Sequence, residues 1–179
     1  MSGSSDAIQL LVNFTHGLLG AFVNLMFTLG TTFAFVGAVF FLASQANARK
    51  APGQSQGMGK TIATLLICGC LAGLDQVIGA GARQFGWQGA SFEAISYVDV
   101  GTFGVAADAA NAVLTLVRML GVMFALQGVL SWKRSQKDGH TGLSAGEDVS
   151  KGTVKFIIGV FCVCNPYLID ALKRSLGLL

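Results

Sequence analysis

Residues 109–131 read AANAVLTLVRMLGVMFALQGVLS, a run of 23 amino acids in which Arg118 is the only charged side chain. As an α-helix rising about 1.5 Å per residue, this run is about 35 Å long, enough to cross a hydrocarbon core of about 30 Å. Three further apolar runs are Phe22–Ser44, Thr61–Ala82 and Phe156–Ala171. The last run is long enough to span only if its helix continues past Lys173. The four runs predict an all-α, membrane-embedded helical bundle.

The composition favours lipid as the main solvent of this bundle. Of the 179 residues, 53% are hydrophobic and only 12% are charged, and the mean hydropathy is +0.62. These values are too apolar for an ordinary soluble domain of this length. We therefore expect lipid to surround most of the helices.

The N-terminal region carries no formal charge from Ala7 to Ala48, which is about twice the length of one membrane crossing. It lacks the basic segment of a secretory signal, so we expect it to be retained. We expect Ala7–Leu19 to form a short helix along the membrane interface, before Gly17 and Gly20 let the chain turn inward. A single straight helix through the whole run is the competing geometry.

Charges inside the apolar runs are rare, and each lies at the same spacing from a basic residue. The three charges are Asp75, Arg118 and Asp170. Each lies 15 positions from a lysine at the end of its own segment, which is Lys60, Lys133 or Lys155. Fifteen helical residues span about 22 Å, so the three charges are expected at one depth, where an Arg between two Asp can neutralise them. The sequence predicts a buried charge cluster that acts as a structural clasp or, alternatively, as a proton or ion path.

Two loops hold most of the positive charge. The segments 46–60 and 132–155 contain eight of the 12 basic residues. The positive-inside rule places both loops in the cytoplasm and both termini on the other side of the membrane. The bases expected to contact lipid, a partner or single-stranded DNA are Arg49, Lys50, Lys60, Lys133, Arg134 and Lys137.

The two halves of the chain share a spacing of polar residues. A shift of 87 residues aligns Asn24 with Asn111, and a shift of 95 aligns Asp75 with Asp170. These matches predict two tandem helical hairpins in the same orientation. The predicted units are a first hairpin with the N-terminal segment over 1–84, a connector over 85–105 and a second hairpin over 106–179.

Small residues four positions apart let helices approach closely in lipid. Gly69 and Gly73 make such a step, as do Gly121 and Ala125. We therefore expect close helix packing and homo-oligomerisation. The residues assigned to packing are Gly69, Gly73, Gly121, Gly128, Gly159 and Pro166.

Neither the cysteines nor the glycine-rich loop predicts a cofactor. Cys68 with Cys70, and Cys162 with Cys164, form two Cys-x-Cys pairs. Residues two apart on a helix point about 200° apart, so neither pair converges on a metal ion, and we expect small buried side chains. Residues 53–61 are similar to a phosphate-binding loop, but the glycine spacing is one residue too long and no strand precedes them. No serine, cysteine or histidine has a base and an orienting acid nearby in sequence, so we do not expect an enzyme.

From Leu116 to Gly177 the chain carries a family resemblance. The residues that carry it are Gly121, Phe124, Gly128, Lys133, Gly159, Pro166 and the closing Leu176 and Gly177. In these residues the chain resembles the hairpin of small polytopic inner-membrane proteins of type IVB systems, which include the Dot/Icm secretion machine and IncI-type plasmid conjugation. The first half matches this pattern less well and has no proline at the place of Pro166.

The resemblance implies a non-enzymatic component of an apparatus that moves DNA or protein across the bacterial envelope. Such a component would lie in the inner membrane with both termini periplasmic, in contact with lipid, further copies of itself and other subunits. An alternative is a subunit of the conjugative pilus, whose basic loops would face a lumen that carries single-stranded DNA. A small transporter or channel built from parallel repeats is the alternative from a different class.

Overall fold

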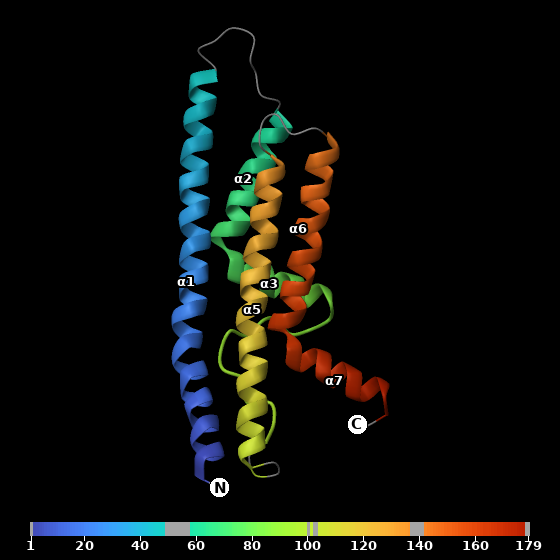
Figure 1. Cartoon of the computed structure of the whole chain (residues 1–179). Coiled ribbons are helices and arrows are strands. Elements are labelled where there is room, and N and C mark those ends of the chain that lie inside the picture. Colours follow the sequence, from blue (N-terminus) through green and yellow to red (C-terminus); the bar gives the residue numbers. More distant parts are fainter. Residues whose placement is uncertain (1, 49–57, 100, 102–103, 137–141, 178–179) are drawn as a thin grey trace.

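The computed structural model describes residues 2–48, 58–99, 101, 104–136 and 142–177. Within these ranges the chain is all-α, as the apolar runs predict. The six helices of the described residues, shown in Figure 1, are α1 Ser2–Ala48, α2 Met58–Ala72, α3 Leu74–Gln84, α5 Val105–Ser135, α6 Gly142–Val163 and α7 Asn165–Ser175.

Two of these helices are long and apolar enough to cross a membrane alone. The candidate spans are Gln9–Asn47 within α1 and Ala106–Ser135 within α5. The other two apolar runs form bent pairs instead of straight helices: α2 and α3 meet at 93°, and α6 and α7 meet at 79°. The 15 residues of α2 reach only about 22 Å, which is shorter than the hydrocarbon core. The chain is thus a candidate membrane bundle of two long helices and two bent pairs.

The two bends have different local causes. Pro166 lies at the beginning of α7 and has no N–H to donate to the carbonyl of Cys162, so the helical ladder is interrupted there. The bend between α2 and α3 contains no proline and falls at Gly73, whose backbone has φ −111° and ψ 45°. This conformation lies outside the helical region, and a glycine adopts it with no side chain to obstruct the turn.

The N-terminal region is one continuous helix. Because α1 runs unbroken from Ser2 to Ala48, the predicted turn at Gly17 and Gly20 is wrong, and the competing straight geometry is confirmed. A glycine inside a helix costs about 1 kcal/mol but leaves the backbone hydrogen bonds in place. The predicted interfacial helix Ala7–Leu19 is therefore the first part of α1.

The long helices and the first members of the bent pairs lie side by side. Figure 1 shows the C-terminal ends of α1 and α5 at the same end of the molecule as the N-terminal ends of α2 and α6. Partway along the bundle α2 and α6 turn aside, and beyond this level only α1 and α5 continue, with the connector beside them (Figure 1). The largest fully buried apolar side chains are Leu71, Leu74, Ile78, Val122, Val129, Val160 and Val163.

The order of elements is the same in both halves. Each half has one long apolar helix followed by one bent pair. This order is what a tandem repeat requires, and the repeat itself stays a prediction.

Candidate functional site

Arg118 lies in the middle of α5 and binds two backbone carbonyls. Its side chain is only 6% exposed. Nε donates to the carbonyl of Val163 at 3.1 Å, and Nη1 donates to the carbonyl of Glu93. Val163 is the last residue of α6, and Glu93 belongs to the connector. One guanidinium therefore fastens both the α6–α7 bend and the connector to α5.

The structure does not bring the three predicted charges together in an ion pair. Within the described ranges, Arg118 makes no ion pair with Asp75 or Asp170. Asp75 is exposed on α3, and Asp170 lies half-buried on α7, where its Oδ1 accepts a 2.6 Å hydrogen bond from the hydroxyl of Tyr97. Three charges at one depth would require straight helices. Both aspartates lie beyond a bend, which carries them sideways instead of deeper.

A row of polar side chains on α5 binds the connector. Asn111, Thr115 and Arg118 are four and three residues apart, so they share one face of the helix. All three are buried, with at most 8% of each residue exposed. We call these three residues the α5 polar row.

The polar row pairs with backbone groups that would otherwise be unsatisfied. The Oδ1 of Asn111 accepts hydrogen bonds from the amides of Tyr97 and Val98 at 3.0 and 2.9 Å, and its Nδ2 donates to the carbonyl of Val98 at 2.9 Å. The hydroxyl of Thr115 accepts from the amide of Ile95 at 3.1 Å. An irregular backbone segment in an apolar environment requires such partners, because each unpaired group costs several kcal/mol. The connector is therefore held to α5 by side chains rather than by secondary structure.

Tyr97 also links the connector to α7. Its hydroxyl donates to Asp170, and accepts from Nζ of Lys173 at 2.6 Å. The same Nζ lies 4.6 Å from the centroid of the Tyr97 ring. The hydroxyl of Tyr97 thus lies between the negative charge of Asp170 and the positive charge of Lys173 and binds both.

Asn165 secures the first turn of α7. Its Nδ2 donates to the carbonyl of Leu114 on α5 at 2.8 Å. Its Oδ1 is buried and has no hydrogen-bond partner among the described residues. Together with the contact between Arg118 and Val163, this bond attaches both sides of the α6–α7 bend to α5.

The predicted packing glycines divide into two groups. Gly121 on α5 and Gly159 on α6 face each other. A Cβ added to Gly121 would lie 2.8 Å from the carbonyl oxygen of Gly159, and one added to Gly159 would lie 2.7 Å from the carbonyl oxygen of Gly121. Gly128 faces Gly152 in the same reciprocal way, at 2.7 and 2.8 Å. Gly152 was not among the predicted packing residues. Its spacing of seven residues from Gly159, which matches the spacing from Gly121 to Gly128, is the signal that would have found it.

The other predicted packing residues do not bring helices together. A Cβ added to Gly69 would meet nothing within 4 Å, and one added to Gly73 would meet only the carbonyl of Gly69, at 3.7 Å. Both glycines border an open groove, so they face space instead of another helix. Pro166 marks the beginning of α7.

The predicted basic loops are partly helical. Lys60 lies in the first turn of α2, and Lys133 and Arg134 lie in the last turn of α5. Nζ of Lys133 donates to the carbonyl of Phe33 on α1 at 2.8 Å, beside Gly37, where a side chain would obstruct it. Lys133 therefore contributes to the contact between α1 and α5. The remaining predicted bases, Arg49, Lys50 and Lys137, lie outside the described residues.

All four cysteines are free thiols, with Cys68 and Cys164 buried. Among the described residues, no three His, Cys, Asp or Glu side chains lie close enough to hold a metal ion.

Comparisons of the chain with protein-family models, curated proteins and solved structures found no match.

Proposed function

We propose that this protein is a non-enzymatic subunit of a type IVB conjugation or secretion apparatus, which moves DNA or protein across the bacterial envelope. It would reside in the inner membrane with both termini periplasmic, packed against lipid, further copies of itself and other subunits. The observation that carries this proposal is the length and exposure of α1.

The apolar span of α1 is longer than a bilayer can cover. Gln9–Asn47 has 39 residues, which extend about 58 Å as a helix, against a hydrocarbon core of about 30 Å. An average tilt of about 20° shortens the span by only about 4 Å. About half of this helix must therefore lie outside the hydrocarbon. The apolar side chains of that half can be shielded from water only by another protein surface.

We place the N-terminal part of α1 outside the hydrocarbon. There α5 and the connector accompany α1, because α2 and α6 have turned aside (Figure 1). Leu19 and Val23 are each only 4% exposed within the bundle, whereas Leu10 and Phe14 are 74% and 60% exposed. One face of this segment is thus packed in the chain's own core, and another face is free for a neighbouring subunit.

Three of the residues that carry the family resemblance lie where α5 and α6 pack closely. A Cβ added to Gly121, Gly128 or Gly159 would lie within 2.8 Å of backbone atoms of the facing helix. This agreement supports the type IVB proposal, because these residues build the hairpin on which the resemblance rests.

The proposal is tested by site-directed crosslinking in native membranes. In a chain whose four native cysteines are replaced by alanine, Leu10→Cys should form oxidative crosslinks to a second copy or to another subunit. Leu19→Cys is the matched control: it is the same substitution on the buried face and should remain uncrosslinked. If Leu10→Cys stays monomeric in intact membranes, α1 has no protein neighbour and the subunit proposal fails.

A transfer assay tests the proposed apparatus itself. Deleting the coding sequence from a host that carries it should abolish the export of DNA or protein by that host, and the full-length chain supplied in trans should restore export. Undiminished transfer by the deletion strain would contradict the proposal.

The length of α1 also favours a pilus subunit as a second candidate. In a filament, long apolar helices are covered by neighbouring subunits, so bilayer thickness sets no limit. Electron microscopy of the purified assembly separates the two candidates: helical filaments support the pilus subunit, and detergent-bound closed oligomers support the membrane component.

A further inference from the structure

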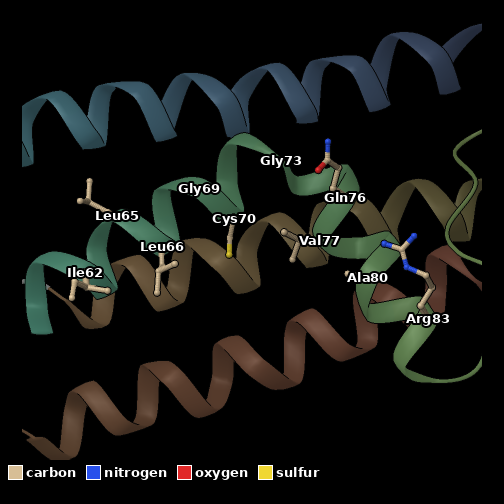
Figure 2. Close-up of a pocket in the computed structure, with 10 residues that line it drawn as sticks. All are labelled: Ile62, Leu65, Leu66, Gly69, Cys70, Gly73, Gln76, Val77, Ala80 and Arg83. Atoms are coloured by element: carbon tan, nitrogen blue, oxygen red, sulfur yellow. The ribbon is translucent and has the colours of Figure 1, made fainter.

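An open groove follows the outer side of the bent pair α2–α3. Its volume is about 660 Å³, and Figure 2 shows the residues that line it. Along α2 the lining is apolar and includes Ile62, Leu66 and Cys70. On α3 the lining ends with Gln76 and Arg83, so one end of the groove is polar (Figure 2).

Glycines keep the groove open. Gly69 and Gly73 lie on its α2 side, and a side chain at Gly69 would extend into empty space. Ile62 and Leu66 are 53% and 65% exposed beside them. The chain thus presents an unfilled apolar channel where a larger residue would have closed it.

The polar end of the groove has donors without protein partners. Arg83 is the only charged side chain in the described lining, and no carboxylate lies among the lining residues. Within the described ranges, neither its guanidinium nor the amide of Gln76 makes a side-chain hydrogen bond or an ion pair. A guanidinium presents a planar fork of N–H donors that matches a phosphate group.

We propose that this groove binds one anionic phospholipid, with an acyl chain along α2 and the phosphate at Arg83. From Ile62 to Gly73, α2 rises about 16 Å, which is close to the thickness of one leaflet, about half of the 30 Å hydrocarbon core. The apolar part of the groove therefore matches the length of one acyl chain.

The charge at Arg83 selects the headgroup. A zwitterionic lipid whose phosphate bound Arg83 would bring its ammonium group close to the guanidinium. The described lining has no carboxylate to pair with that ammonium. A phosphate with an uncharged alcohol, as in phosphatidylglycerol, places only negative charge there. The site rests on the proposed membrane location of the protein.

The test is native mass spectrometry of the full-length protein, released from nanodiscs that contain equal amounts of phosphatidylglycerol and phosphatidylethanolamine. The wild type should retain phosphatidylglycerol in preference. Arg83→Gln should lower that preference about tenfold, which corresponds to about 1.4 kcal/mol. Gly69→Leu should fill the groove and lower retention of both lipids.

Two variants control for charge and for helix substitution. Arg174→Gln removes an exposed basic residue on α7, and Gly20→Leu fills a glycine with open space on α1; both should behave as the wild type. Equal retention of the two lipids by the wild type, or an unchanged preference in Arg83→Gln, would overturn the proposed site. Resistance of the protein to extraction by alkaline carbonate is measured in parallel. Release by carbonate contradicts the membrane location, whereas membrane retention without lipid preference contradicts only the site.

Discussion

Replacing Arg118 with methionine tests whether one side chain fastens the connector and the α6–α7 bend. The substitution keeps much of the side-chain volume but removes the donors to the carbonyls of Glu93 and Val163. A hydrogen bond to a charged group contributes about 1.5–3 kcal/mol, so losing two of them should cost about 3–6 kcal/mol. Lys133→Met is the matched control. It removes one exposed hydrogen bond, from Nζ of Lys133 to the carbonyl of Phe33, and should cost about 1 kcal/mol or less.

The assay is equilibrium unfolding of the purified protein in mixed micelles, followed by circular dichroism, together with hydrogen exchange of the connector amides. In Arg118→Met, the amides of Ile95, Tyr97 and Val98 should exchange faster than in the wild type, because the connector is released at Glu93 nearby. Equal stability of Arg118→Met and Lys133→Met, with unchanged exchange, would refute this role of Arg118.

A double-mutant cycle separates the observed partners from the predicted ones. If Arg118 binds carbonyls only, the effects of Arg118→Met and Asp75→Asn should add to within about 0.5 kcal/mol, because Asp75 is exposed on α3 and shares no partner with Arg118 among the described residues. A coupling well above about 1 kcal/mol would restore the ion pair between these residues and contradict the structure.

Three further predictions concern packing, the connector and the level of the bends. Gly159→Ala should lower the free energy of unfolding by about 1–3 kcal/mol, because the new Cβ would lie 2.6 Å from the amide nitrogen of Ala125, whereas Gly69→Ala should cost nothing; unfolding in micelles compares the two. Asn111→Ala should cost at least about 2 kcal/mol and expose the connector to limited proteolysis, since two amides lose their acceptor. A nitroxide at Gln76 on α3 should be relaxed mainly by a water-soluble nickel chelate and one at Phe35 on α1 mainly by oxygen; the same response at both positions would show that α3 does not lie at the membrane boundary.

The helices could be predicted from the apolar runs, because a long uncharged segment in lipid has few alternatives to a helix. The bends could not be predicted from the same signal. Gly73 is compatible with a continuous helix, as Gly17 and Gly20 show within α1. Pro166 is equally ambiguous, because membrane helices tolerate proline when neighbouring groups satisfy the carbonyl that proline leaves free. Whether a glycine or proline bends a helix therefore depends on tertiary contacts, such as the one from Arg118 to Val163.

The burial of Arg118 could be predicted, but its partners could not. Charge patterns reveal only charged partners, and the observed partners are carbonyls, which every residue has. The remaining signal is the spacing of polar residues along an apolar helix. Asn111 was singled out only through the internal repeat, although with Thr115 and Arg118 it marks the face of α5 that binds the connector.

The equal spacing of the three charges has a simpler explanation than a cluster. Each lies 15 residues from a basic residue, and each occupies the level at which the bundle changes: Asp75 follows the first bend, Arg118 binds the residue before the second, and Asp170 lies on α7. A chain that turns along a membrane boundary places its polar residues there without pairing them, because water, headgroups and carbonyls are available as partners. The N-terminal half of α1 continues beyond that level, and it exposes Leu10 and Phe14 where acyl chains are no longer available to cover them.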